Sequence, residues 1–355
     1  MALTEFGVNH ALAVKRWSTS LAVEAEKKSY FKKFIGSIIE RKTDLEKKAG
    51  DQITYGLRMK LRGAGVTGDN TLEGNEEALT YYSDAILIDQ LRHAVRSKGK
   101  ASEQRVPYPM RATAREALAT WFAERFDELM FVFLSGARGV DSTLTLPLSF
   151  TSFAGNTVTA PDAAHIKYAN GLAKATITSS DILTLSEIDK LVETAETVDP
   201  MIQPIMVDGE KRYILLIHPY QATDLRTNAS TGQWLDIQKA AAAAQGSGNA
   251  IFTGALGMYN GVVIHVHRNV VRFSDYGSGT DQPAARALFL GSQAGAIAFG
   301  NGGGETAARY SWVEELFDYK NQLGVSAGSI FGIKKTRFNS ADFGVIALDT
   351  YATSH

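Results

Sequence analysis

Residues 51–96 limit the fold of this chain more than any other segment, because they read as a long two-stranded ribbon with a polar end. In residues 51–62 apolar side chains alternate with polar ones, a period of two that is typical of a half-buried antiparallel strand. Residues 63–77 contain four glycines and almost no large apolar group, and residues 78–96 return to β-favouring residues. Because a two-stranded ribbon is marginally stable alone in water, this one needs another surface to lie on.

The polar end of the ribbon also matches a nucleotide-binding pattern. Gly63, Gly65 and Gly68 have the spacing G-x-G-x-x-G, and Asp84 and Asp89 follow at about the distance of a ribose-binding acid. In that fold the preceding strand is buried on both faces, and the glycines open a helix whose N-terminus holds the pyrophosphate. Here the preceding strand alternates, and the residues that follow favour a turn. The context therefore favours the bend of a ribbon over a nucleotide site.

Residues 109–134 predict the longest helix of the chain. Pro109 suits a first helical turn, and Gly136 suits the helix end. Apolar residues recur at spacings of three and four, namely Leu118, Phe122, Phe126, Leu129 and Phe133. At 1.5 Å per residue this helix would be roughly 39 Å long, the length of a domain. Residues 311–323 stay open between a helix, which a capping box favours, and a strand.

The remaining elements are mixed in order. A helix is predicted over residues 185–197, where Thr184 and Glu187 form a capping box. A buried strand is predicted at residues 212–219, and another strand is predicted at residues 261–267. Helices and strands do not alternate regularly along the chain, so the sequence predicts an α+β fold rather than a doubly wound sheet.

A serine-hydrolase pattern lies near the C-terminus. Residues 324–328 match G-x-S-x-G with Ser326 as the nucleophile, and Asp342 or Asp349 and then His355 follow in hydrolase order. The pattern requires a turn from a strand into a helix, but the residues after it favour a strand. The last residue of a chain is also a poor position for a rigid general base. The sequence therefore disfavours a hydrolase.

Two histidines on one predicted strand raise the question of a metal site. His265 and His267 share a face because alternate residues of a strand do, and His218 on another strand could supply a third ligand. Histidines at this spacing are more often two side chains on an interface or an exposed face. We therefore expect no metal and no other cofactor.

Composition excludes several classes of site. The chain has no cysteine, which excludes disulfides, thiolate metal sites, iron–sulfur clusters and cysteine nucleophiles. A net charge of −1 means that any contact with nucleic acid must be local. No apolar run is long enough for a membrane span. Residues 1–50 hold ten Lys and Arg against six Asp and Glu, which indicates a solvated helical face or an arm near an acidic partner.

Long blocks of this sequence resemble the major capsid proteins of tailed bacteriophages, in the family typified by the N-four-like podoviruses. The blocks spread over most of the chain, from about residue 49 to residue 339, and are far more specific than a three-glycine pattern. They are AGDQITYGLRMKLRGAGVTGDNTLEGNEEALTYY, IDQLRHAVRSKGKASEQR, LIHPYQATDLRT, IFTGALGMYNGVVIHVH and NQLGVSAGSIFGIKKTRFN.

The resemblance implies the Hong Kong 97-type capsid fold, an α+β architecture with an arm, an extended loop and two domains. Its expected parts are an N-terminal arm (1–50), an extended β-ribbon loop (51–100) with its tip at 63–77, a peripheral domain (101–204) with a spine helix (109–134), an axial domain (205–305), and a return to the peripheral domain (306–355). The function implied is structural: copies assemble into pentamers and hexamers of an icosahedral shell around double-stranded DNA.

The resemblance also implies which residues make contacts. In the extended loop, the residues expected to contact a neighbouring subunit are Tyr55, Leu57, Arg58, Met59, Lys60, Arg62, Gly63, Gly65, Gly68, Asp69, Glu73, Glu76 and Glu77. The arm lysines expected to face the interior and the DNA are Lys27, Lys28, Lys32, Lys33, Lys47 and Lys48.

The implied partners are the chain itself, a separate scaffolding protein, a portal protein, packaged double-stranded DNA bound non-specifically and, in some lattices, a decoration protein. The implied location is the virion capsid, assembled in the cytoplasm of a bacterial host, with no membrane contact. The alternatives are a non-viral encapsulin-type cage and, less favoured, a nucleotide-dependent or serine-hydrolase enzyme.

Overall fold

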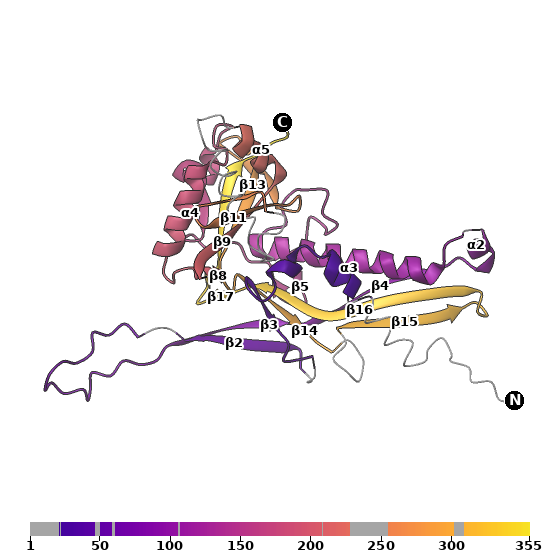
Figure 1. Cartoon of the computed structure of the whole chain (residues 1–355), viewed down its shortest axis with the longest axis horizontal. Coiled ribbons are helices and arrows are strands. Elements are labelled where there is room, and N and C mark those ends of the chain that lie inside the picture. Colours follow the sequence, from indigo (N-terminus) through magenta and orange to yellow (C-terminus); the bar gives the residue numbers. More distant parts are fainter. Residues whose placement is uncertain are drawn as a thin grey trace.

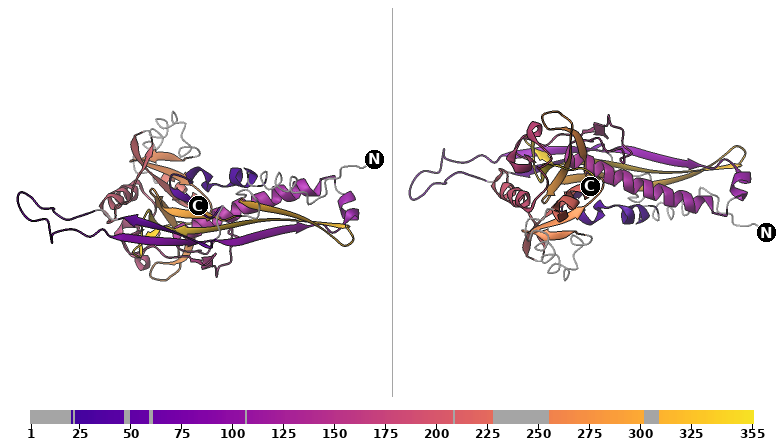
Figure 2. Two further views of the ribbon diagram at one scale, coloured as in Figure 1. Left: turned by 90° about the horizontal axis from the view of Figure 1, so that it is seen from below. Right: turned by 90° about the horizontal axis from the view of Figure 1, so that it is seen from above.

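The computed structural model describes residues 21, 23–46, 50–58, 61–105, 107–207, 209–227, 255–301 and 309–355. The molecule is elongated, and a ribbon with its loop projects from one end (Figure 1). Helix α2 (Lys100–Gln104) and the turn between strands β15 (Tyr310–Phe317) and β16 (Gln322–Lys335) lie at the opposite end (Figures 1 and 2). Two larger sheets form the body, and the longest helix, α3 (Met110–Ser135), runs along one of them.

The first sheet has five strands and carries α3 on one face. Its central strand, β16 (Gln322–Lys335), pairs antiparallel with three others, and a fifth strand is parallel to one of these. The other members are β1 (Ile39–Lys42), β4 (Asp89–Arg96), β14 (Gly295–Phe299) and β15 (Tyr310–Phe317), with β14 between β1 and β16. Residues 311–323, for which the sequence left helix and strand open, lie mainly in strand β15 and the turn after it. Every second residue at the start of this strand is buried, namely Tyr310, Trp312 and Glu314, as expected for a strand with one face on the body.

Helix α3 begins one residue after the predicted start and ends one residue later than predicted. Its apolar residues are buried as the spacing predicts: Leu118, Phe122, Phe126, Leu129 and Phe133. Gly136 ends the helix in the left-handed conformation (φ 69°), and a Cβ there would lie 2.3 Å from the carbonyl oxygen of Thr159. The helix end therefore requires glycine for its backbone conformation and for its packing.

The second sheet has eight strands. Its main path runs β10 (Gly257–Tyr259), β11 (Val262–Val266), β9 (Glu210–Ile217), β13 (Gln282–Leu290), β19 (Val345–Tyr351) and β7 (Ile166–Tyr168), while β12 (Arg272–Tyr276) pairs with β13 and β8 (Ile205–Val207) with β9. One face packs on the α3 core and the other on helices α4 (Leu185–Thr197) and α5 (Pro219–Thr227). Strand β9 is apolar over Tyr213–Ile217 because both its faces are buried there, which fits the buried strand predicted for residues 212–219.

A buried ion pair joins this sheet to the end of α3. The Arg286 guanidinium on β13 donates two 2.7 Å hydrogen bonds to the Asp349 carboxylate on β19. Its third nitrogen donates to the carbonyl oxygen of Ser135, the last residue of α3 (2.9 Å), and the Tyr276 hydroxyl donates to Asp349 (2.6 Å). Because every charge here has a partner, the network fixes the sheet against the helix.

The ribbon consists of β2 (Gln52–Arg58) and β3 (Tyr81–Leu87), paired antiparallel from Gln52 with Leu87 to Arg58 with Tyr81. The predicted alternation is confirmed, since Ile53 is buried and its sequence neighbours are exposed. Residues 78–96 were expected to form the second arm of the ribbon alone. They divide at Ile88, and β4 leaves the ribbon to pair with β16.

Short elements complete the fold. They are η1 (Phe31–Phe34), η2 (Ala169–Gly171), η3 (Lys174–Thr176), β5 (Ser152–Phe153), β6 (Asn156–Thr157), β17 (Arg337–Phe338) and β18 (Ala341–Asp342). Helix α4 has the predicted bounds, but Thr184 makes no side-chain cap. The Glu187 carboxylate instead accepts from Lys190 Nζ (2.6 Å) and the Asn170 N–H (3.1 Å), so the predicted capping box is wrong.

The expected segment bounds differ from the sheets in two places. Residues 306–355 were expected to return together to the long-helix domain, but β19 lies in the eight-stranded sheet, while β15 and β16 lie under α3. Residues 205–305 were expected in one domain, but β14 belongs to the five-stranded sheet. Both differences arise because pairing joins strands far apart in sequence, which periodicity along the chain does not reveal.

Candidate functional site

The loop beyond the ribbon is the most exposed part of the molecule. Residues 61–80 contain no helix or strand, and they extend away from the body in each view (Figures 1 and 2). At the neck, the Glu77 carboxylate accepts hydrogen bonds from the N–H groups of Arg62 (2.7 Å) and Gly63 (2.6 Å). These bonds lower the pKa of Glu77. The neck is thus closed by one charged side chain rather than by a strand ladder.

Arg62 has a second contact that fixes the direction of the loop. Its guanidinium lies 2.6 and 2.8 Å from the two carboxylate oxygens of Asp199, in the connection after α4. The hydrogen bond raises the pKa of Arg62 and lowers that of Asp199. The sequence predicted that Arg62 meets an acidic group on an adjacent subunit; in the structure, its acidic partner belongs to its own chain.

The loop presents both apolar and acidic side chains to solvent. Four large apolar residues keep half or more of their surface exposed: Leu61, Leu72, Leu79 and Tyr81. Between them lie the exposed residues Asp69, Glu73 and Glu76. Exposed leucines on a loop that projects from the body are available for contact with another molecule.

Two of the predicted tip glycines have positive φ angles, 70° at Gly65 and 65° at Gly68, with open space around each. They allow turns that other residues adopt only with strain. Gly63 differs, because a Cβ there would lie 2.8 Å from Glu77 Oε2. Its role is close approach to the carboxylate that closes the neck.

Tyr55 was expected to contact a neighbouring subunit, and in the structure it contacts residues of its own chain. Its hydroxyl donates to Asp84 (3.0 Å), and its ring meets Phe338 edge-on at 6.0 Å. Lys334 Nζ also bonds the Asp84 carboxylate, and burial raises the pKa of Tyr55. Tyr55 therefore anchors the base of the ribbon. Leu57 is half-buried and Arg58 is exposed, whereas Met59 and Lys60 lie outside the described residues.

The predicted arm lysines divide into different environments. Lys27 is exposed, Lys28 Nζ donates to Thr120 Oγ1 (2.8 Å), and Lys32 Nζ lies 4.0 Å from Glu26 Oε2. Lys33 Nζ lies 3.2 Å from His265 Nδ1 and 4.2 Å from the centroid of the Tyr30 ring, and burial lowers its pKa to about 8. Lys47 and Lys48 lie outside the described residues.

The described residues of segment 21–46, which exclude residue 22, pack on the body, whereas the sequence led us to expect an arm over residues 1–50; residues 1–20 lie outside the described residues. Phe31 and Phe34 are fully buried in the core that includes Phe131 of α3. The Asp127 carboxylate, also on α3, accepts from Ser29 Oγ (2.7 Å) and the Tyr30 N–H (2.7 Å). Burial raises the pKa of Asp127 to about 6. Asp127 was not among the residues predicted from the sequence, although an acidic residue on the apolar face of the predicted helix is a signal for such a role.

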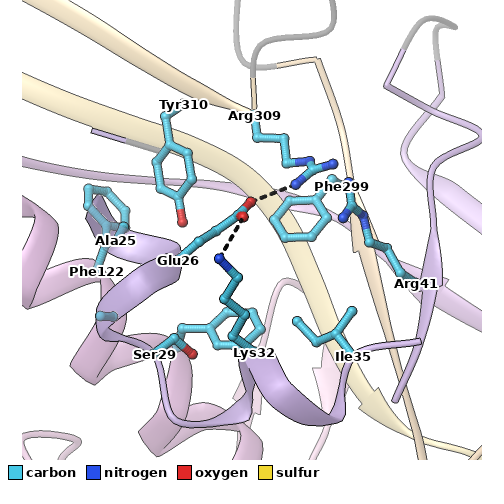
Figure 3. A pocket seen from close by; sticks show the side chains of 12 residues that line it. Ala25, Glu26, Ser29, Lys32, Ile35, Arg41, Phe122, Phe299, Arg309 and Tyr310 are labelled. Carbon is cyan, nitrogen blue, oxygen red and sulfur yellow. Dashed lines mark hydrogen bonds and ion pairs between the residues drawn. The ribbon is translucent and has the colours of Figure 1, made fainter. Parts of the chain in front are cut away.

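A cavity of about 240 Å³ lies between this segment and the body (Figure 3). Its lining comes from four parts of the chain: residues 25–41, α3, β14 and the start of β15. The apolar lining includes Phe122, Phe126 and Phe299, all buried. The charged lining consists of Glu26, Lys32, Arg41 and Arg309, and Glu26 pairs with Arg309 at 2.7 Å.

The alternative chemical motifs lack the geometry that they require. Residues 63–68 open no helix, so the N-terminal phosphate site of a dinucleotide fold is missing from this described stretch. Ser326 lies within β16 rather than on a strand-to-helix turn, and His355 Nε2 pairs with Asp224 at 3.0 Å. Residues 324–328 instead allow cross-strand packing, since the Phe317 ring covers Gly324 and the Arg96 guanidinium covers that ring at 4.2 Å.

The three histidines considered as metal ligands have other environments. His265 is buried beside Lys33, and His267 stacks on Phe131 with centroids 4.8 Å apart. Burial lowers the pKa values of His218 and His267 to about 4. Within the described ranges, no group of three His, Asp or Glu residues could hold a metal ion.

Comparison with known proteins assigns the class to which this fold belongs. The capsid of Ralstonia phage GP4 is similar at 45% identity and a TM-score of 0.84, covering 99% of each chain. The capsid of cyanophage Pam1 shares the fold at 22% identity and a TM-score of 0.70, covering 90% of this chain and 89% of that one. A major capsid protein of Pseudomonas phage KPP25 is 29% identical over 93% of each sequence. The molecule therefore has the α+β fold of phage capsid subunits.

The family model for phage capsid proteins matches residues 5–354. The chain belongs to this phage capsid protein family, and its role is structural, as a capsid subunit. The comparisons give no support to the non-viral cage considered from the sequence. Among the helices that the structure describes, none is long and apolar enough to cross a membrane.

Proposed function

We propose that copies of this chain assemble into pentamers and hexamers of a closed icosahedral shell, with the extended loop of each subunit covering part of a neighbour. The observation that carries the proposal is the loop itself. It exposes Leu72 and Leu79 among acidic residues, and as a whole it projects away from the body of its own chain (Figure 1). Burying such side chains between copies stabilises a lattice through many individually modest contacts.

The same loop would also determine how two neighbouring subunits are aligned when they bind. Asp69, Glu73 and Glu76 add negative charge at the tip, and charge of one sign orients an encounter and penalises wrong pairings. Gly65 and Gly68 allow the tip to turn. We propose that these turns differ between pentamers and hexamers, where the same loop meets its neighbour at different angles.

The shell encloses double-stranded DNA in this proposal, and a scaffolding protein and a portal take part in assembly within the bacterial cytoplasm. The exposed Lys27 is the described lysine that best suits contact with DNA, whereas Lys28 and Lys33 already contact their own chain. A DNA contact through few lysines would be weak and salt-dependent. We further propose that the chain has no catalytic role.

The test is deletion of residues 63–77 from the full chain, expressed with its phage partners. The expected result is a subunit with unchanged thermal unfolding and no closed shells by electron microscopy, because the loop contributes contacts to a neighbour rather than to its own core. Thr71→Ser, within the same loop, is the matched control and should assemble normally. Normal shells from the deletion variant would refute the role of the loop.

A further inference from the structure

The cavity between residues 21–46 and α3 has a floor suited to one apolar side chain. Ala25, Phe122 and Phe126 line it from the segment and the helix, and Phe299 lines it from β14. All four are buried, so a group that enters the cavity loses its water. Its volume of about 240 Å³ lies below the roughly 300–1,000 Å³ of pockets for drug-sized ligands. An apolar side chain the size of leucine fits within this volume.

The cationic side chains around the cavity outnumber the carboxylates that pair with them. Three cationic side chains, Lys32, Arg41 and Arg309, face two carboxylates, Glu26 and Glu46. The two closest contacts are those of Arg309, at 2.7 Å to Glu26 and 3.0 Å to Glu46.

Of the two arginines, Arg41 has the weaker pairing. Its guanidinium lies 3.8 Å from Glu46, and within the described part of the chain its Nε is buried without a hydrogen-bond partner. The guanidinium carbons of Arg41 and Arg309 lie 5.8 and 5.2 Å from the centroid of the Phe299 ring, which holds them over the cavity. The site therefore suits an apolar side chain that has a carboxylate beside it.

That combination occurs at the tip of the extended loop. Leu72 is 60% exposed, and the exposed Glu73 follows it at a turn. The loop projects away from the segment that forms the cavity, so it does not reach the cavity of its own chain (Figures 1 and 2). The occupant consistent with both observations is the loop of a second copy.

We propose that Leu72 of one copy enters this cavity in the next copy, with Glu73 on Arg41. The proposal rests on the role of the loop given above and names the surface that receives it. The contact joins two different surfaces, so repeating it links many copies, in a ring where the rotation between copies closes, rather than forming an isolated pair. Segment 21–46 then forms one side of the cavity that binds the loop of a neighbouring subunit.

Disulfide trapping tests this contact cleanly because the chain has no cysteine. The variant carries Leu72→Cys and Ile35→Cys, since Ile35 lines the cavity and a disulfide needs Cα atoms within about 7 Å. Assembled particles are oxidised and run on a non-reducing gel. The expected result is a ladder of multimers that dissociated subunits do not give. The matched control replaces Ile35→Cys with Val140→Cys, an exposed position outside the cavity lining, and should give no ladder.

Intact particles without a ladder would overturn the proposal while leaving the role of the loop in place, as would an equal ladder in the control. Absence of particles from the unmodified chain would instead contradict the proposed function, and electron microscopy reads that outcome separately.

Charge reversal gives a second measurement that does not need cysteines. Arg41→Glu or Glu73→Arg alone should lower particle yield at least about tenfold, because like charges would then face each other across the contact. The double variant should recover much of that yield. Unchanged yields in the single variants, or no recovery in the double variant, would overturn the pairing. Thermal unfolding of each dissociated subunit checks that the variants still fold.

Discussion

The extended loop and segment 21–46 both read as projecting arms in the sequence, but they have opposite structures. Residues 61–80 are exposed almost throughout and contact the rest of the chain chiefly through Arg62 and Asp199. Segment 21–46 buries Phe31 and Phe34 in the main core. Both are polar and charged overall, so the difference lies in a few buried aromatic and aliphatic residues, among them Ile38 and Ile39. The comparison implies that changes in the segment affect folding, whereas changes in the loop affect assembly.

The largest expected effect on subunit stability is that of Phe31→Ala. Phe31 is fully buried, and its ring lies 4.8 Å from that of Phe131. Truncating a buried phenylalanine typically costs about 3–5 kcal/mol, since it removes apolar burial and leaves a cavity. Leu72→Ala in the loop should leave the free energy of unfolding unchanged. Denaturant unfolding of dissociated subunits measures both, and similar effects at the two sites would contradict the comparison.

Two glycines with nearly the same φ sharpen the comparison next. Gly136 has φ 69° and Gly65 has φ 70°, but a Cβ at Gly136 would meet backbone at 2.3 Å while Gly65 has open space. Gly136→Ala should cost about 2–4 kcal/mol, because overpacking adds to left-handed strain. Gly65→Ala should leave global unfolding unchanged. An equal loss of stability in both variants, measured by thermal melts, would show that packing does not decide the effect.

Much of the fold follows from the sequence where a pattern is local. Helix α4 has the predicted bounds and α3 differs by one residue at each end, because apolar periodicity and flanking Pro or Gly residues are local signals. The split of residues 78–96 at Ile88 and the placement of β19 depend on distant partners, β16 and β13. No alternation within a strand specifies its neighbour.

The candidate site shows the same division. The loop was predictable because its glycines and its lack of large apolar groups prevent a strand. The cavity was not, because Arg41, Phe122, Phe299 and Arg309 come from four separate parts of the chain. The contacts of Tyr55 within its own chain were not predicted, because alternation identifies a buried face without saying whether the burying surface belongs to the same chain.

The contact of Asp127 with segment 21–46 should make the free energy of unfolding depend on pH. Burial raises the pKa of Asp127 to about 6, above its ordinary value of 3.8, so the folded chain binds this proton more tightly than the unfolded chain. The resulting stability is present below about pH 4 and is lost as the pH rises through about 6, by about 1–3 kcal/mol. Asp127→Asn should remove this slope.

The measurement for Asp127 is the difference between the unfolding free energies of the two proteins from pH 4 to 7. Other carboxyl groups titrate in both proteins, so the difference isolates Asp127. The natural chain should lose stability relative to the variant as the pH rises to about 6. A constant difference over this range would mean that Asp127 has an ordinary pKa.

The smallest effect on stability is expected at the contact between loop and body. Arg62 and Asp199 are both well exposed, and such pairs contribute little to folding. Asp199→Asn should therefore leave unfolding unchanged, yet it should speed amide exchange in residues 61–63, because the Arg62 side chain no longer fixes the neck. Added salt should produce the same change in the natural chain, since it screens exposed charges. The contrary outcome is that amide exchange at the neck depends only on Glu77, which accepts hydrogen bonds from the N–H groups of Arg62 and Gly63. In that case Glu77→Gln will accelerate exchange and Asp199→Asn will not, and the Arg62–Asp199 pair does not set the direction of the loop.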